Sequence, residues 1–490
     1  MPENSELEPR ESETIQGNVL AAFNKDNQVF IFLQFSDPQY GAAWLGDLVP
    51  RLATTKAVAF FNDAFSQARR SSGGDPSNLK ALWLGVGLTK EGLFKLAPQL
   101  EADASALDPS FVAGPVERAR ALGDRRASDP SEWVFGGPGQ PCIDAILTIA
   151  ADDLADLRTE VNRQWSLAAR HRMFVVYEQL AQTLPGQGAS REHFGFRDGI
   201  SQPGVIGFDP PDELGTQVLG RPGTWLLSPG EFVLGQHREF ETNPPVVPNW
   251  LVDGSYQVFR RLAQDVPSWW AQVIRQQYTL RSKRGESMIN ADLLGAKMIG
   301  RWRSGTPLAN APEGDNRSAQ DPTEDNSFEF GLDDPAGLTT PRFAHIRKMY
   351  SRDVADDQAE KHRILRRGIP YGLPFDPTLG RGYGVDAERG LCFNAFMASI
   401  KGQFEYLQEK LANTANLPRP GDGKDPVIGE GSSELSLIVG MDKDGKPAEQ
   451  SLDFQRFVTT TGAAYAIVLS IPTLQGIASG DIKPGKEYAN

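Results

Sequence analysis

The chain has 490 residues, too many for one ordinary hydrophobic core, so two or more domains are expected. Its 40% hydrophobic and 23% charged residues are typical of a globular protein and exclude an intrinsically disordered one. The formal net charge of −13 argues against a nucleic-acid partner, and no apolar run approaches the roughly 20 residues that span a bilayer.

The first half of the chain alternates strand-like and helix-like patterns. Dense β-branched and aromatic residues predict strands at Val29–Phe35, Lys80–Leu88, Pro141–Ala151 and Arg172–Gln182. Helices are predicted between them at Ala42–Leu52, Thr89–Leu96 and Asp152–Ala169, the last of which is amphipathic. This order indicates an antiparallel sheet with helices packed on one face, which is an α+β architecture.

A second cycle follows the Pro/Gly-rich stretch Gln202–Gly230. Strands are predicted at Gly230–Gly235, Gly254–Gln264, Gly390–Ala398 and Phe457–Ile471, and helices at Val266–Leu280 and Ser399–Asn413. The acidic, weakly periodic segment Thr306–Leu338 is typical of a surface loop. We therefore expect two similar α+β domains, residues 1–215 and 216–490, although no sequence repeat establishes a duplication.

The N-terminus and the cysteines indicate the cellular compartment. The polar, acidic start MPENSELEPRESETIQ lacks the basic and apolar regions of a secretory leader, and Met1 argues against a leader already removed. Cys142 and Cys392 lie far apart in apolar surroundings, which predicts two buried thiols, and no CxxCH motif is present for covalent haem attachment. We expect a cytoplasmic protein with no membrane partner.

Three segments carry the chemistry. His193–Gly204 reads HFGFRDGISQPG and places Asp198 among glycines and aromatics, FAHIRK contains His345, and HRILRRGIPYG contains an arginine pair. Together they resemble the dye-decolourising peroxidases, whose signature is GxxDG followed by a haem-ligating His and a distal Arg. The match extends in order from IQGNVL to DPVIG, most of the chain. The resemblance implies two ferredoxin-like domains, with non-covalent haem b between them or within the C-terminal half.

Five histidines could supply the axial ligand that haem iron requires, and any single histidine is more often structural. His345 differs from the others because apolar residues precede it and basic residues follow it. Phe343 and Ile346 could line a haem pocket, and Arg347 and Lys348 could meet the haem propionates. The family's proximal histidine lies in such a segment, so the resemblance favours His345. The remaining candidates are His171, His193, His237 and His362.

A peroxidase must move a proton between the two peroxide oxygens and stabilise the charge that develops. By resemblance, Asp198 is the proton shuttle and Arg366 the fixed cation. Without that resemblance, the Asp198–Gly199 pair is more typical of a turn, and Arg366 could belong to a surface ion pair. Because neighbouring side chains on a strand point to opposite faces, Arg366 or Arg367 should reach the pocket, not both.

The resemblance also places Leu391 and Phe393, two apart on one strand face, over the distal side of the haem. Either residue could instead belong to the ordinary core. A carboxylate usually orients the second nitrogen of a ligating histidine. Asp425 in KDPVIG is the first candidate for that role and Glu405 the reserve, and each could equally be a solvated charge.

The resemblance implies a peroxidase that uses hydrogen peroxide to oxidise dyes, phenols and similar aromatic donors through a ferryl intermediate. A haem-binding or haem-processing protein without peroxide turnover is the alternative, and the Asp198–Arg366 pair argues against it. Nucleotide and zinc enzymes are disfavoured by the absence of GxGxxG, P-loop and HExxH motifs. The sequence leaves open the physiological reductant, Mn²⁺ oxidation by the acidic segment Asp315–Asp334, any surface Trp or Tyr relay, and the oligomeric state.

Overall fold

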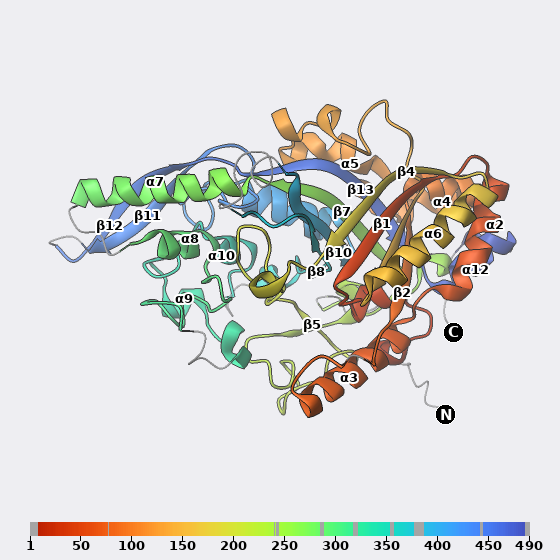
Figure 1. The fold of residues 1–490 in the computed structure, drawn as a ribbon, viewed down its shortest axis with the longest axis horizontal. Coiled ribbons are helices and arrows are strands. Elements are labelled where there is room, and N and C mark those ends of the chain that lie inside the picture. The colour runs from red at the N-terminus through yellow and green to blue at the C-terminus, as the bar shows by residue number, and fades with distance from the viewer. Residues whose placement is uncertain are drawn as a thin grey trace.

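The computed structural model describes residues 8–76, 78–239, 241, 245–284, 289–316, 322–352, 357–376, 387–441 and 444–485. Within these residues, nine strands form one antiparallel sheet that is flanked by helices (Figure 1). This is the α+β arrangement expected from the sequence. No helix in the described ranges combines the length and the apolar character needed to cross a membrane.

The N-terminal half contributes four strands in the order β4-β1-β3-β2. They confirm the four predicted strands and are β1 (Asn27–Gln34), β2 (Leu82–Leu88), β3 (Ala145–Ala151) and β4 (Phe174–Gln182). The helices that connect them include α2 (Pro38–Leu48), α4 (Lys90–Leu96) and α6 (Leu154–Arg170). Each of these three helices begins at a side chain that caps a backbone N–H, namely Asp37, Thr89 and Asp153.

Strand β1 shows how this half is packed. Val29 and Ile31 face the helices and belong to the largest hydrophobic core. Phe30 and Phe32 point to the other face of the sheet, because successive side chains of a strand alternate. There their rings lie 4.8 and 5.1 Å from the ring of Phe259, which comes from the C-terminal half. The sheet therefore curves so that its two halves enclose a second, aromatic core.

The C-terminal half repeats the same strand order, as β13-β7-β10-β8. Its strands are β7 (Ser255–Gln264), β8 (Leu365–Arg366), β10 (Arg389–Met397) and β13 (Val458–Val468), with β9 (Ile369–Gly372) also paired to β10. Both halves thus have the ferredoxin-like arrangement expected from the resemblance. Pairing of β2 with β13 at Leu88 and Ile467 makes the sheet continuous.

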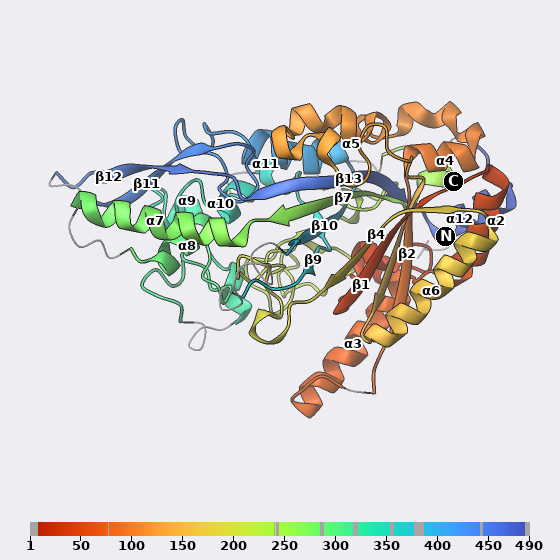
Figure 2. The same cartoon turned by 45° about the horizontal axis from the view of Figure 1, so that its top comes forward.

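Some of the remaining elements flank this sheet, and others, including α7 and the strands β11 and β12, extend from one end of it (Figure 2). The other α-helices are α1 (Gly17–Leu20), α3 (Thr55–Ser72), α5 (Pro109–Leu122), α7 (Val266–Arg284), α8 (Ala291–Ile299), α9 (Phe330–Asp333), α10 (His345–Met349), α11 (Asp357–Glu360) and α12 (Ile471–Ser479). Two π-helical segments are Ile400–Phe404 and Leu407–Ala412. The small strands and the long hairpin are β5 (Gly204–Val205), β6 (Leu226–Leu227), β11 (Ser433–Met441) and β12 (Pro447–Phe454).

Short 3-10 turns connect many of these elements. They are Pro9–Glu11, Val49–Arg51, Pro98–Ala106, Arg126–Ser128, Pro130–Glu132, Gly186–Gly188, Pro229–Glu231, Asn249–Leu251 and Pro322–Asn326. The division at 215/216 falls between β5 and β6, which pair with each other in parallel. That division stays a proposal.

The predicted strand at Gly230–Gly235 is wrong. The chain instead forms the 3-10 turn Pro229–Glu231 and then bends, with Phe232 and Val233 buried in a small core. A short apolar run signals burial and does not by itself distinguish a strand from a buried turn. A side chain at Gly230 would meet the carbonyl oxygens of Gln236 and His237 at 2.4 Å, so this bend requires glycine.

Two other regions refine the sequence-based predictions. The predicted helix Ser399–Asn413 is present, but its hydrogen bonding is π-helical. The acidic segment Thr306–Leu338 is mainly irregular and contains the short helix α9, while its residues 317–321 lie outside the described residues. No group of three or more metal-ligating side chains occurs in the described part of the chain.

Candidate active site

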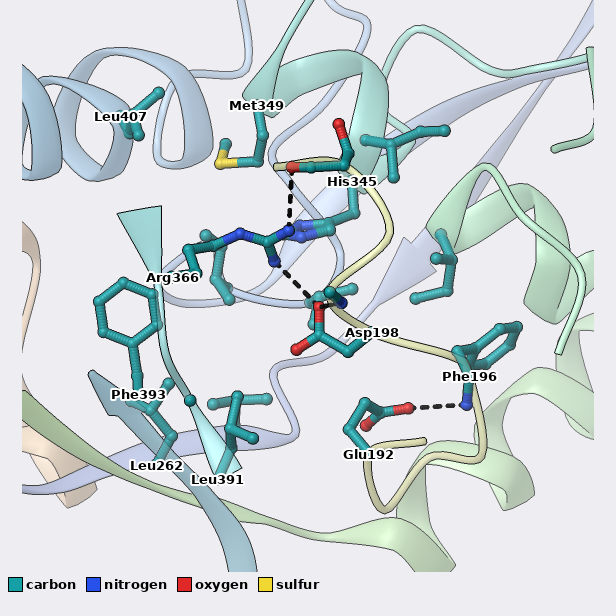
Figure 3. Close-up of a pocket in the computed structure, with 18 of the residues that line it drawn as sticks. Glu192, Phe196, Asp198, Leu262, His345, Met349, Arg366, Leu391, Phe393 and Leu407 are labelled. Carbon is teal, nitrogen blue, oxygen red and sulfur yellow. Dashed lines mark hydrogen bonds and ion pairs between the residues drawn. The ribbon is translucent and has the colours of Figure 1, made fainter. Parts of the chain in front are cut away.

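A pocket opens between the C-terminal strands and helix α10. Its walls come from the ends of β7, β8 and β10, from α10, and from the loop Glu192–Ser201 that follows β4. Figure 3 shows His345, Arg366 and Asp198 converging on the same space within it. These three side chains are separated by up to 168 positions in the sequence, and the fold brings them together.

His345 is the first residue of α10, and its side chain is 25% exposed toward the pocket. Its Nδ1 lies 2.8 Å from Oδ2 of the fully buried Asp425. The other oxygen of Asp425 accepts backbone N–H groups of Val427 and Ile428 at 2.8 and 3.0 Å. This arrangement fixes Nδ1 as the hydrogen-bonding nitrogen of the ring and leaves Nε2 as its available lone pair.

His345 and Asp425 shift each other's pKa. Burial alone would raise the pKa of Asp425, but the charge and hydrogen bond of His345, with two backbone N–H groups, hold it below its ordinary value. Burial would lower the pKa of His345, and the Asp425 carboxylate reverses this so that the pKa is raised. Glu405, the other candidate partner, instead lies against Arg118, Ser110 and Tyr465.

Asp198 and Arg366 form an ion pair on the opposite wall. Nη1 of Arg366 donates to Oδ1 of Asp198 at 2.9 Å, and the same oxygen accepts the Gly199 N–H at 2.6 Å. Oδ2 of Asp198 faces the pocket without a protein donor in the described structure. Burial would raise the pKa of Asp198, but the Arg366 cation outweighs it and lowers that pKa.

Arg366 is held in place by its backbone as well as its side chain. It lies in the edge strand β8, where the side-chain amide of Gln202 bonds both of its backbone groups. The Arg366 backbone N–H donates to Gln202 Oε1 at 3.2 Å, and Gln202 Nε2 donates to the Arg366 carbonyl at 2.9 Å. Its Nη2 donates to the Ser201 carbonyl at 3.3 Å. Arg367 points the other way and donates to the carbonyls of Val19 and Leu20 at the end of α1. The expected alternation of the two arginines is therefore present.

Leu391 and Phe393 share one face of β10, and both line the pocket beside Leu262 of β7 (Figure 3). Phe393 also contacts Phe404, with ring centroids 5.7 Å apart. Both residues are partly exposed while their neighbours Cys392 and Asn394 are fully buried. They give this wall of the pocket an apolar surface.

The prediction that Arg347 meets the haem propionates is not supported by its position. Arg347 is buried and does not line the pocket. Its Nη1 donates to the carbonyls of Asp334 and Thr340 at 2.9 Å, and its guanidinium lies over the ring of Phe330. Residues two apart on a helix point about 200° apart, so Arg347 faces away from the side on which His345 meets the pocket.

Other pocket residues were not predicted from the sequence. Arg363 lies three positions before Arg366 and lines the same pocket, as do Arg301 and Tyr350. His362, one of the rejected histidines, also lines it, with its ring stacked on Tyr406 at 3.5 Å. The sequence held one indication that Arg363 lies in the pocket, since it belongs to the same HRILRR segment as Arg366.

A second, more polar pocket adjoins the first at Asp198 and Arg366. Its lining includes Asn18, Lys25 and Asp26, which come from the segments before β1. The Asp198–Arg366 pair therefore lies between an apolar cavity that contains His345 and a polar cavity on its other side.

The donor set fits haem. An imidazole with one nitrogen bound to a carboxylate and the other available is a suitable axial ligand for haem iron. The apolar walls suit a macrocycle, and the Asp198–Arg366 pair opposite His345 offers a base and a cation to a small polar reactant.

Comparison with known proteins supports this interpretation. The family model described as "DyP dimeric alpha+beta barrel domain" matches residues 14–181, and "Dyp-type peroxidase, C-terminal" matches residues 245–419. The dye-decolorizing peroxidase msp1 of Mycetinis scorodonius is 29% identical over 95% of this chain and 87% of its own. The multifunctional dye peroxidase DyP2 of an Amycolatopsis species is 30% identical over 94% and 95%. A solved ancestral D-type dye decolorizing peroxidase is 28% identical, with a TM-score of 0.76 over 94% of this chain and 98% of its own.

The fold and the matches define the class as a peroxidase. The chain belongs to the dye-decolourising peroxidase family. Membership implies a haem cofactor and hydrogen peroxide as the oxidant, and it makes the protein an oxidoreductase.

Proposed function

We propose that this protein binds haem b non-covalently through His345 and uses hydrogen peroxide to oxidise dyes, phenols and similar aromatic donors. The observation that carries the proposal is the Asp198–Arg366 ion pair, at 2.9 Å, in the same pocket as the carboxylate-bound His345. A protein that only carried haem would not need a base and a fixed cation there.

The cofactor would supply an iron centre that accepts oxidising equivalents from peroxide and passes them to donors one electron at a time. Non-covalent binding is supported by the positions of the cysteines, since neither Cys142 nor Cys392 lines the pocket. Both thiols are free, which supports a reducing compartment such as the cytoplasm.

Asp198 acts as the proton acceptor and later the proton donor. Both hydrogen bonds to its carboxylate go to Oδ1, so Oδ2 is the oxygen that takes the peroxide proton. The proton is then returned to the departing oxygen, which leaves as water. Because Arg366 holds the pKa of Asp198 below its ordinary value, Asp198 is ionised and ready to accept a proton in acidic solution.

Arg366 supplies a positive charge that is not lost at any working pH, in a planar group with fixed donors. Its two bonds, to Asp198 and to the Ser201 carbonyl, fix the plane of the guanidinium. On the other side of the pocket, Asp425 raises the basicity of the His345 ring and fixes its orientation.

The test uses the spectrum and the activity of one purified protein. Wild-type protein is expected to show a Soret band and to oxidise a small phenol and an anthraquinone dye only when peroxide is added. His345→Ala should lose most of the haem or change the ligand-field spectrum, because its Nε2 is the proposed ligand.

A His345→Ala variant with the wild-type spectrum and full haem occupancy would contradict the ligand assignment. A haem-loaded wild type without peroxide-dependent oxidation would favour the alternative, a haem-binding or haem-processing protein. Including Mn²⁺ as a third donor in the same assay tests whether it is also a reductant.

A further inference from the structure

Lys348 is a buried cation on the short helix that carries His345. It lies three positions after His345 in α10 and is only 5% exposed. The sequence made it a candidate partner of the haem propionates, but it does not line the pocket. Burial of an ammonium group is unfavourable unless its donors are satisfied, so its partners indicate what it does there.

The ammonium group of Lys348 has an acceptor for each of its donors. Nζ donates to the carbonyl oxygens of Thr414, Leu417 and Gly423 at 2.6, 2.8 and 2.8 Å. A lysine ammonium has three donors and no acceptor, so these bonds use its full capacity. All three carbonyls belong to the segment 414–423, so one side chain fixes the shape of that segment.

This segment leads directly to Asp425, the carboxylate that orients His345. Lys348 bonds Gly423, two residues before Asp425, and His345 bonds Asp425 itself at 2.8 Å. Residues three apart on a helix lie on the same face, so both bonds leave the same side of α10. Two side chains therefore join the ligand-bearing helix to the chain around Asp425.

Helix α10 depends on such anchors for its orientation. It is five residues long and has no side-chain hydrogen bond at its N-cap. A helix of that length is not stable by itself in water. Arg347 anchors its other side through the carbonyls of Asp334 and Thr340, and Lys348 anchors the side that faces Asp425.

The charge of Lys348 lies near the same carboxylate. Burial lowers the pKa of Lys348 to about 8, and the negative charges of Asp425 and Asp422 oppose that shift. The group is therefore a cation at neutral and acidic pH, where all three of its N–H donors are present.

We propose that Lys348 is a positioning residue that fixes the hydrogen bond between Asp425 and His345 and, through it, the strength of the bond from His345 to haem iron. The inference rests on the proposed function and deepens it by naming the group that holds the ligand and its carboxylate in register. A hydrogen bond weakens steeply when its geometry changes, so a small shift of the segment 414–425 would weaken it. A carboxylate partner raises the basicity of a ligating imidazole, and a more basic imidazole binds iron more strongly.

The test measures the iron–imidazole stretching band of the reduced, haem-loaded, full-length protein by resonance Raman spectroscopy. This band reports the strength of the iron–Nε2 bond in the haem-bound molecules alone. Asp425→Asn should lower its frequency, because an amide oxygen is a weaker acceptor than a carboxylate. Lys348→Met should shift the band in the same direction and weaken haem binding by about 10-fold, the lower end of the range for residues that orient a metal ligand.

Two further variants separate position from charge and from general stability. Lys348→Arg keeps the cation, but its planar fork cannot place three donors around one point, so the frequency should again fall. The double variant Lys348→Met, Asp425→Asn should show the band of Asp425→Asn alone, because Lys348 acts through that carboxylate.

Lys297→Met is the matched control. Lys297 in α8 is also buried, and burial lowers its pKa to about 8 as well. Its Nζ donates to the carbonyls of Leu338 and Thr339 at 2.9 Å, outside the segment that leads to Asp425. This variant should keep the wild-type frequency even where its melting temperature falls.

A Lys348→Met band at or above the wild-type frequency would overturn the inference, since loss of the cation alone would strengthen Asp425 as an acceptor. So would a double variant whose band lies clearly below that of Asp425→Asn, or a Lys348→Arg variant with the wild-type band. If both Lys348 variants bound no haem while Lys297→Met bound it normally, Lys348 would serve folding alone and the inference would fail. A haem-loaded wild type without an iron–imidazole band would instead contradict the assignment of His345 as the ligand, which every other outcome leaves standing.

Discussion

The strands β2 and β8 occupy the same position in the two ferredoxin-like halves but have opposite chemistry. Strand β2 reads LWLGVGL and buries Leu84, Val86 and Leu88 in the main core. Strand β8 is only Leu365–Arg366 and presents a charged side chain to a cavity. The shared strand order thus fixes the backbone, and the side chains decide whether a position serves packing or chemistry.

The neighbouring strands show the same contrast. Every residue of β3 is buried, whereas β10 leaves Leu391 and Phe393 partly exposed to the pocket. The connections explain the difference, since β3 is covered by α6, while the long connection between β7 and β8 carries α7 to α11 around the pocket. In the N-terminal half the connecting helices close a core, and in the C-terminal half they surround an open site.

The largest effect that would test this contrast is expected for Asp198→Asn. An amide cannot accept the peroxide proton, so the peroxide step should slow by about 10²- to 10⁴-fold at every pH at which the wild type works. Stopped-flow mixing of the haem-loaded variant with peroxide measures that step. If the variant reacted with peroxide at a rate within a few-fold of wild type, Asp198 would not be the proton acceptor.

The pH profile of the wild type follows from the lowered pKa of Asp198. The Asp198 carboxyl is ionised at pH values above its pKa and protonated below it. Activity should therefore be present above that pKa and be lost as the pH falls through it. Ordinary values are near ~3.9 for Asp and ~6.5 for His, so oxidation of dyes should persist well below pH ~5. An activity that already declines below roughly pH 6.5 would indicate a histidine base instead.

Arg366→Leu is expected to slow the peroxide step by about 10²- to 10³-fold while haem binding is retained, because a preorganised charge is removed. Arg367→Leu is the matched control, since Arg367 donates to the backbone carbonyls at the end of α1 and not into the haem pocket. It should lower the melting temperature but leave the peroxide rate of the folded fraction unchanged. If Arg367→Leu slowed the peroxide step and Arg366→Leu did not, Arg367 would be the residue of β8 that acts in the pocket.

The smallest effect on chemistry is expected in the other half. Leu84 in β2 is 2% exposed, and Leu84→Ala should reduce the free energy of unfolding by about 2–5 kcal/mol through the cavity it leaves. Denaturant titration measures this loss, and the peroxide rate per haem should remain that of wild type. A large change in that rate with little change in stability would mean that the two halves are not divided between packing and chemistry.

The sequence predicted the strands of the sheet because their apolar runs are long and rich in β-branched residues. It predicted that only one of Arg366 and Arg367 reaches the pocket from the alternation of a strand, and the structure shows that alternation. The prediction of a strand at Gly230–Gly235 was wrong because a buried 3-10 turn can have the same local composition as a strand. Local pattern predicts burial more reliably than it predicts backbone shape.

The partners of the site residues were harder to predict, since they depend on contacts between distant segments. Asp425 and Glu405 could not be distinguished before the structure placed Asp425 beside His345, 80 positions away. The position of Arg347 does not support its predicted contact with the propionates, because a basic residue next to His345 in sequence need not share its face of a helix. Arg363 was overlooked because its place in the wall of the pocket is visible only in the folded chain.

The aromatic core between the halves has a consequence for how the protein is made. Phe30 and Phe32 emerge from the ribosome more than 200 residues before Phe259, the ring of the C-terminal half that packs against both. At synthesis rates of about 5–20 residues per second, the nascent N-terminal half exposes this aromatic face for roughly ten seconds or more. Apolar surface that is exposed for such a time is prone to aggregation. The pocket is complete only after β13 has been translated, because Val458 and Thr460 of that strand line it.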